Sequence, residues 1–341
     1  MRKISLDRID ELFERIASQN ALYMPTDTEK GAKYALWKKG SQPSEALNTV
    51  RSAKDFFFPQ TENLMDFKVE GKSIEVIDTR SECEDFVLFG VRGCDVKSFE
   101  ILDRVFLSDP VDTYYQNRRS HCTIMSMACT KPHETCFCKT FGIDAAAPEG
   151  DVVCYRTNDA LYMIAASDKG SALLALVEDI TEETDSAKVD EQKALIHERY
   201  EKLPLASLSA EGFGDGKTKE YFDAPQWKEL SQSCLGCGTC TFVCPTCQCY
   251  DIKDFDTGHG VKRFRCWDSC MYSNFTKMSA GQPRLTQIER FRQRFMHKLV
   301  YYPTNNDGLF SCVGCGRCLS KCPIQMNIVK VMKALGGGDN D

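Results

Sequence analysis

Apolar residues in the first 200 positions switch between the spacing of helices and the spacing of strands. Near the N-terminus they recur at three- and four-residue steps, which predicts an amphipathic helix with Ile9, Leu12, Phe13 and Ile16 on its buried face. A continuous apolar run at 86–91 predicts a buried strand. Residues 95–107 then predict a helix whose inward positions are Phe99, Leu102, Val105 and Phe106.

Shorter apolar segments predict further elements in the same region. Residues 68–77 alternate around Gly71 and predict a hairpin. Strands are also predicted at 123–128, 152–155 and 161–166, and helices at 171–179 and 184–202, the last one charged and exposed. Strands that alternate with helices favour an α/β domain, with α+β as the variant arrangement, over residues 1–202.

The remainder of the chain has a different character. Residues 203–219 are rich in Ser, Gly and Ala and predict a linker to a second domain at 220–341. Gly216-Lys217-Thr218 resembles the end of a phosphate loop, but Glu211 occupies the place of its first glycine, and no GxGxxG opens a helix. The chain therefore shows no nucleotide-binding motif.

One predicted helix of the second domain combines apolar and basic residues. Residues 285–300 place Ile288, Phe291, Phe295 and Leu299 on one face. Basic residues surround that face: Arg290, Arg292, Arg294 and Lys298. We expect a packing helix with a basic flank, and a docking surface for an acidic partner is the alternative.

Nineteen cysteines change the picture, because eight of them form two matching runs. Each run reads Cys-x2-Cys-x2-Cys-x3-Cys-Pro, as in bacterial ferredoxins, where three thiolates hold one 4Fe–4S cluster and the fourth holds the other. The first expected ligand set is therefore Cys234, Cys237, Cys240 and Cys322. The second is Cys312, Cys315, Cys318 and Cys244. The chemistry that this predicts is one-electron transfer.

Two other interpretations of these runs fit less well. A zinc site normally pairs two CxxC units around one ion. A disulfide framework needs an oxidising compartment, and an odd number of cysteines cannot pair completely.

The two runs also share glycines at matching places, Gly236 with Gly314 and Gly238 with Gly316. These glycines allow the backbone to curl around a cubic 4Fe–4S cluster.

The remaining cysteines are also grouped. A third candidate set, for a 4Fe–4S cluster or zinc, is Cys247, Cys249, Cys266 and Cys270. A fourth, with zinc again as the alternative, is Cys94, Cys129, Cys136 and Cys138, which follow predicted strands whose ends can converge. We expect Cys83, Cys122 and Cys154 to be ordinary buried thiols. No catalytic residue and no cofactor beyond two to four clusters is predicted.

Charge and hydropathy restrict the setting. Residues from 221 onward hold 15 Lys and Arg against 10 Asp and Glu, a balance of +5 that leaves −11 for residues 1–220. A basic shell would offset the charge of about −2 at each cluster site. No basic run exceeds Lys262-Arg263, which disfavours nucleic acid. Asp7 precedes any apolar segment and no apolar run reaches membrane length, so we expect a cytoplasmic chain without membrane insertion.

Several stretches together carry a resemblance to a known family. Besides the two ferredoxin runs they are Arg92-Gly93-Cys94-Asp95, Thr135-Cys136-Phe137-Cys138, Trp267-Asp268-Ser269-Cys270 and His297-Lys298. With them the chain resembles the iron–sulfur subunits that include the β subunit of cytoplasmic nickel–iron hydrogenases (sulfhydrogenases) and the A subunit of anaerobic sulfite reductase. Cys266 departs from the family pattern, which has another residue there.

The resemblance implies a function. Such a subunit relays electrons between a subunit that binds FAD and NAD(P)H and a catalytic subunit of hydrogenase or sulfite-reductase type. Two alternatives stay open, namely a free-standing ferredoxin-like carrier without fixed partners and a zinc-holding scaffold. The resemblance also implies a ferredoxin-like second domain, here with a long insert between its two cysteine runs.

Overall fold

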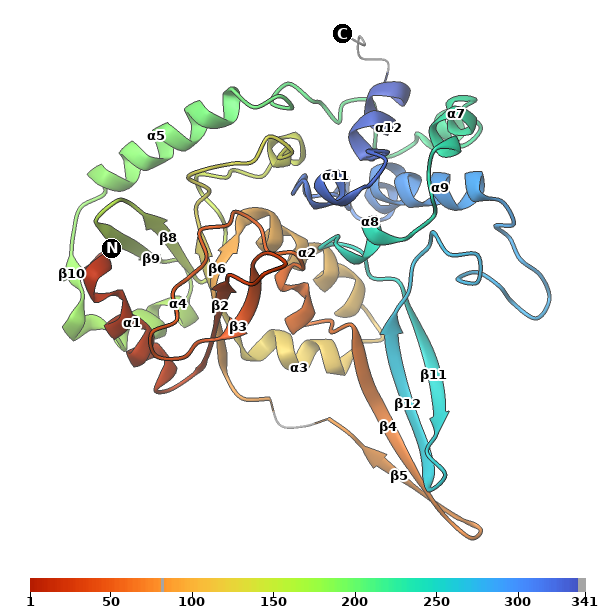
Figure 1. The fold of residues 1–341 in the computed structure, drawn as a ribbon, viewed down its shortest axis with the longest axis horizontal. Helices are drawn as coiled ribbons and strands as arrows, with labels where there is room; N and C mark the ends of the chain where they lie inside the picture. Colours follow the sequence, from red (N-terminus) through yellow and green to blue (C-terminus); the bar gives the residue numbers. More distant parts are fainter. Residues whose placement is uncertain (81–82, 337–341) are drawn as a thin grey trace.

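The computed structural model describes residues 1–80 and 83–336, and it divides into a sheet region, a helical region and a projecting arm (Figure 1). The sheet region comes from the N-terminal half of the chain. Most of the helical region comes from the C-terminal third, and the arm combines strands from both. No helix in these described ranges is long and apolar enough to cross a membrane.

The sheet region is built on eight strands in the order β10-β1-β9-β8-β7-β6-β2-β3. Its central strands β2, β6, β7 and β8 are parallel, and the outer pairs are antiparallel. The carboxyl ends of the four parallel strands therefore meet at one edge of the sheet. The bounds are β1 (Arg2–Ser5), β2 (Ala21–Thr26), β3 (Lys33–Leu36), β6 (Phe86–Arg92), β7 (Cys122–Met127), β8 (Val152–Arg156), β9 (Ala160–Ala165) and β10 (Glu182–Glu183).

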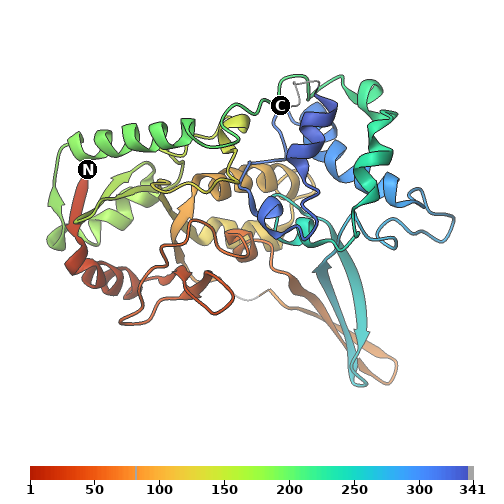
Figure 2. The same cartoon turned by 45° about the horizontal axis from the view of Figure 1, so that its top comes forward.

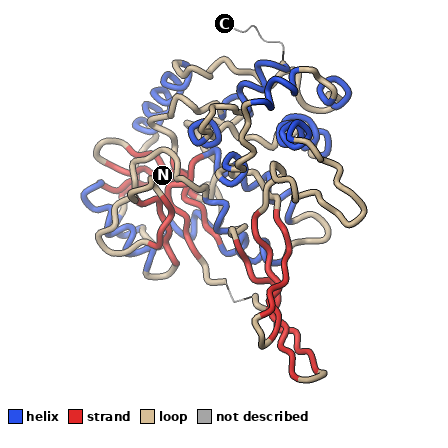
Figure 3. The backbone as a smooth tube through the Cα atoms, turned by 45° about the vertical axis from the view of Figure 1, so that its right-hand side comes forward, coloured by secondary structure: helices blue, strands red, loops and turns tan. Residues whose placement is uncertain are grey.

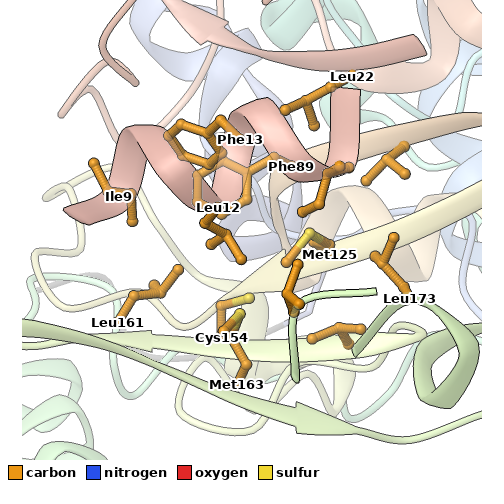
Figure 4. Close-up of a cluster of buried hydrophobic side chains, with 14 of the residues drawn as sticks. Ile9, Leu12, Phe13, Leu22, Phe89, Met125, Cys154, Leu161, Met163 and Leu173 are labelled. Carbon is orange, nitrogen blue, oxygen red and sulfur yellow. The ribbon is translucent and has the colours of Figure 1, made fainter. Parts of the chain in front are cut away.

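Helices cover both faces of this sheet. The helix α1 (Ile9–Ala17) buries its predicted apolar face with α4 (Asp168–Ala175) against Phe89, Met125 and Met163 (Figure 4). On the other face lie α2 (Gly93–Phe106), α3 (Thr113–His121) and the short η2 (Ala53–Phe56). Each large apolar side chain buried here contributes about 1.5–3 kcal/mol to folding.

The arm is a four-stranded antiparallel sheet in the order β11-β12-β4-β5, and it projects from the body (Figures 1 and 3). Its strands are β4 (Thr61–Glu70), β5 (Ser73–Asp78), β11 (Tyr250–Asp256) and β12 (Gly260–Trp267). The central pair joins β12 to β4, so that Cys266 faces Thr61 across the ladder. The two parts of the chain thus share one sheet.

The helical region forms its own core. The helix α9 (Gln287–Met296) packs on α7 (Gln226–Gln232), and α12 (Ile328–Leu335) also contacts α7 (Figure 2). Trp227, Phe291 and Phe295 are buried between them. This region also contains α6 (Thr218–Phe222), α8 (Thr239–Phe242), the π turn η5 (His297–Tyr301), α10 (Tyr302–Asn305) and α11 (Arg317–Lys321), whereas α5 (Ala187–Glu201) packs on the sheet region.

Most elements predicted from the pattern are confirmed, with shifted ends. The hairpin at 68–77 is β4–β5, the run at 86–91 is β6, and the helix at 95–107 is α2. The helix predicted at 171–179 is wrong in extent, because α4 ends at Ala175. The segment 203–219 packs Phe213 on the helical core, and the Gly214 N–H donates to the Leu299 carbonyl at 2.8 Å.

Predictions about exposure were wrong at several positions. Ile288, expected in the core, is 36% exposed. Arg294 and Lys298, expected on a solvated flank, are only 3% exposed. The helix α5, expected to be exposed, buries Tyr200. Of the cysteines expected to be ordinary buried thiols, Cys122 and Cys154 are buried and Cys83 is half-buried.

Candidate metal centres

The second predicted set lines a single cavity. Cys312 and Cys315 come from the loop that leads into α11, Cys318 lies in the first turn of α11, and Cys244 comes from the turn after α8. Phe137, Val313 and Ile328 close the space around the four sulfurs. Four thiols around an enclosed, largely apolar space are the donor set that a 4Fe–4S cluster takes, so the residues fit that group.

A buried lysine balances the charge of this second set. The Lys298 ammonium donates to the Thr246 hydroxyl at 2.7 Å and to the Ser311 carbonyl at 2.9 Å. Burial alone would lower the pKa of Lys298, but the sulfurs of Cys244, Cys247 and Cys312 raise that pKa above its ordinary value. The side chain therefore stays charged, and it ties the Cys244 segment to the Cys312 segment.

Three members of the first set lie near one another at α8, namely Cys234, Cys237 and Cys240. Burial raises the pKa of Cys240, Arg294 lowers it, and the nearby sulfurs of Cys234 and Cys244 raise it further. Cys322 follows α11, which packs against α8, and its thiol donates to the Met326 carbonyl at 3.4 Å. The element that carries the fourth predicted ligand thus lies beside the element that carries Cys240.

The third set is only partly brought together. A hydrogen bond from the Cys270 thiol lowers the pKa of Cys249 to about 7, so these two sulfurs lie in contact. A hydrogen bond between thiols also joins Cys247 to Cys244 of the second set. Cys266 instead faces an open pocket with Asp251 and Lys253, and no described cysteine affects its pKa.

A second buried lysine holds the segment between the second and third sets. Lys54 is 1% exposed, and its ammonium donates to the carbonyls of Cys244 at 3.1 Å and Cys247 at 2.9 Å. The same ammonium lies 3.7 Å from the ring centroid of Trp267, a cation–π contact. A residue of the N-terminal part thereby fixes a ligand loop almost 200 positions later.

The fourth predicted set lines one cavity at the edge of the eight-stranded sheet. Cys94 lies in the first turn of α2 after β6, and Cys129 follows β7. Cys136 and Cys138 reach the same cavity from the following loop. The Tyr200 hydroxyl lies 3.0 Å from the Cys138 sulfur, and burial raises the pKa of Tyr200, so the phenol stays neutral.

The second and fourth cavities adjoin each other. Cys315 and Gly314 line both of them. A buried ion pair joins the two regions, since the Arg317 guanidinium donates to both oxygens of Asp95, at 2.5 and 2.8 Å. This ion pair places Asp95, which follows Cys94, beside Arg317, which precedes Cys318. It therefore fixes the position of the fourth cysteine group relative to the second.

Gly314 makes this junction possible. Its φ is +57°, its carbonyl accepts from the Phe137 N–H at 2.9 Å, and an added Cβ would overlap the Phe137 backbone. Gly236 holds the matching place in the first run, with φ +65° and nothing near its missing Cβ.

We predict that Gly314→Ala destabilises the chain by about 1–3 kcal/mol more than Gly236→Ala, because only the former adds a backbone overlap to the shared cost of positive φ. Thermal unfolding of the two anaerobically purified variants measures the difference. Equal melting temperatures would show that the Phe137 contact does not restrict the site.

Sequence reasoning identified the thiols but missed the groups that surround them. Lys54 and Tyr200 carry no motif and reach the sites only through the fold. Arg294 and Lys298, predicted to lie on a solvated flank, are buried and line the second cavity. Within the described residues, no group of three or more His, Cys, Asp and Glu side chains is packed closely enough for a single metal ion. This finding is compatible with 4Fe–4S clusters, because such a cluster is larger than one ion and holds its four thiolates farther apart.

Comparison with known proteins agrees with the cysteine pattern. Residues 233–326 match the family described as "4Fe-4S dicluster domain". The chain is 32% identical to "Sulfhydrogenase 2 subunit beta" of Pyrococcus furiosus over an alignment of 341 positions, which covers 98% of each protein. No solved structure matches. The chain thus carries a mixed sheet and helix N-terminal region and a C-terminal 4Fe–4S dicluster domain, with at least two clusters.

Proposed function

The chain belongs to the family of hydrogenase β subunits, and from this premise we propose that it relays electrons between a subunit that binds FAD and NAD(P)H and a catalytic redox subunit. An iron–sulfur electron-transfer subunit is what the relative and the dicluster domain support. The observation that carries the proposal is the continuity of the cysteine groups: Cys315 lines two cavities, and Cys244 contacts Cys247.

Residues of this chain supply the conditions for such a relay. When bound, 4Fe–4S clusters supply one-electron redox chemistry. The thiols must be deprotonated to bind iron, and the buried cations Arg294 and Lys298, whose pKa values the nearby sulfurs raise, offset their negative charge. Apolar residues such as Phe137 and Ile328 exclude water from the second cavity.

The need for a flavin partner follows from electron counting. A hydride from NAD(P)H carries two electrons, whereas each cluster takes one. A flavin can divide the pair because it has a stable one-electron state, and this chain shows no nucleotide-binding motif of its own. The relative is named as a sulfhydrogenase subunit, which favours a hydrogenase-type catalytic partner over the sulfite-reductase type.

The proposal includes four clusters and a division of the chain. The ferredoxin-like domain spans 220–341 with a long insert at 245–311, and it holds the first, second and third sets. The α/β domain at 1–202 holds the fourth, and 203–219 links them in a cytoplasmic protein. For the third set the contacts support Cys247, Cys249 and Cys270, whereas Cys266 lies apart.

Anaerobic purification with iron and acid-labile sulfide analysis tests the proposal. We expect about 16 iron atoms per chain, and about 8 or 12 would reduce the number of clusters to two or three. Stable co-purification with a flavin-containing subunit is expected as well. A monomer that keeps its iron would favour the free-standing carrier, and a colourless protein with zinc would exclude electron relay.

A further inference from the structure

A cavity of about 670 Å³ lies at the carboxyl edge of the eight-stranded sheet and belongs to none of the cysteine groups. All four parallel strands end on it: Pro25 comes from β2, Phe89 from β6, Met127 from β7 and Arg156 from β8. In open α/β sheets this edge is where small ligands bind. The volume is in the range of pockets for small molecules and cofactors, roughly 300–1,000 Å³.

The strand β6 is shaped where it borders this cavity. Its pairing with β7 shifts register between Phe89 and Val91, which makes a bulge at Gly90. Gly90 has φ +79°, lines the cavity and has no side chain to fill it. Bulges and strand glycines of this kind often mark a place where a ligand approaches the backbone.

The lining separates into an apolar part and a cationic part. Ile9, Phe89, Met127, Leu161 and Leu195 supply apolar surface. Leu195 is 42% exposed, and it faces this cavity from α5, which passes along the sheet (Figures 1 and 2).

The charged residues of the lining are Arg92, Lys131, Arg156, Arg199 and Glu45, a net charge of +3. The Arg156–Glu45 pair is 3.6 Å long and largely exposed, so it leaves the cationic character intact. An occupant that complements both parts joins an apolar ring system to an anionic group.

The cavity also borders the fourth cysteine group. Leu47 and Arg92 line both spaces. The Arg92 guanidinium donates to the Leu47 carbonyl at 3.1 Å and to the Ala128 carbonyl at 3.0 Å, which fixes the wall between them. A molecule in the cavity would lie one residue away from Cys129.

We propose that this cavity binds a ligand of mononucleotide size that carries an aromatic ring system and a phosphate group. The ring lies on the apolar residues of the strand ends, and the phosphate pairs with Lys131, Arg156 and Arg199. The absence of a glycine-rich phosphate loop is compatible with this, since cationic side chains rather than backbone N–H groups would hold the phosphate. The proposal does not depend on the electron relay.

Binding of three matched probes to the anaerobically purified chain tests the assignment. The probes are FMN, riboflavin, which lacks the phosphate, and AMP, which carries another ring. We expect FMN or AMP to bind in a 1:1 ratio, and FMN to bind at least tenfold more tightly than riboflavin. Titration calorimetry and flavin fluorescence measure the affinities.

Charge-reversal variants locate the site. The double variant Lys131→Glu with Arg156→Glu should weaken phosphate-bearing probes at least tenfold and remove the preference for FMN over riboflavin. Lys188→Glu is the control, because Lys188 is an exposed residue of α5 outside the cavity. Iron content should stay the same in both variants.

Three results would overturn the proposal. The first is that neither FMN nor AMP binds at millimolar concentration. The second is equal binding by the double variant and the wild type, which would place the site elsewhere. The third is a cross-link or protected segment showing that an acidic stretch of a partner subunit fills the cavity in the purified complex. A chain that binds FMN but does not transfer electrons between the partner subunits would count against the proposed function alone.

Discussion

Cys315→Ser is expected to lose about four iron atoms per chain and to stop electron transfer between donor and acceptor. Cys315 lines both the second and the fourth cavity, so its sulfur lies where the two cysteine groups meet. A serine hydroxyl has a far higher pKa than a thiol and lacks its soft sulfur, so it is a much poorer ligand for cluster iron than a thiolate. Iron and labile-sulfide analysis and anaerobic reduction assays measure the two effects.

Cys83→Ser is the matched control for this variant. Cys83 is half-buried and belongs to none of the four sets; it packs against the core beside α2 and α3, and its thiol donates to the Glu84 carbonyl at 3.6 Å. The Cys83→Ser variant should keep its full iron content and its rate of electron transfer. If Cys315→Ser also kept all its iron, the assignment of the second set would be refuted. If Cys83→Ser lost iron, the loss could not be assigned to a ligand position.

Lys298→Met is expected to lower the midpoint potential of the second site by roughly 100 mV. A positive charge stabilises the more negative, reduced state, and a unit charge about 6–8 Å away contributes about 2–3 kcal/mol at an effective dielectric constant of about 20. Removal of the Lys298 ammonium should also destabilise the fold by about 3–5 kcal/mol, because its buried partners lose the cation that they bind. Redox titration followed by electron paramagnetic resonance measures the potential.

Two companion variants separate charge from packing. Lys298→Arg keeps the cation near Thr246 and Ser311 and should recover most of the potential. Lys330→Met removes an exposed lysine from α12 and should change neither potential nor stability. A potential that is the same in Lys298→Met and the wild type would mean that this ammonium acts only as a structural link.

The two buried lysines have related roles in the arrangement of the sites. Lys298 joins the Cys244 segment to the Cys312 segment, and Lys54 joins the Cys244 carbonyl to the Cys247 carbonyl. Together they surround the short stretch that serves both the second and the third set. Cationic residues at this point offset the accumulated thiolate charge, which is the physical basis for packing several cysteine groups so closely.

The ligand chemistry of this protein could be predicted from its cysteine pattern. Ligand type and spacing are local properties, so the runs at 234–244 and 312–322 could be read without the fold. The helix at Ile9–Ala17 and the strand at Phe86–Arg92 were likewise evident, because a single buried face imposes its period on the adjacent residues.

The distant groups that surround the cysteines could not be predicted, because only the folded chain brings them together. Lys54 and Tyr200 meet Cys247 and Cys138 across long stretches of chain, and such contacts leave no local period or spacing. The hairpin β4–β5 was predicted, but its pairing with β12 was missed for the same reason, since β12 pairs with β4 through hydrogen bonds between backbones rather than through any sequence signal. Burial of Lys298 could not be predicted either, because a charged side chain is placed inside only when negative partners from other segments compensate its lost hydration.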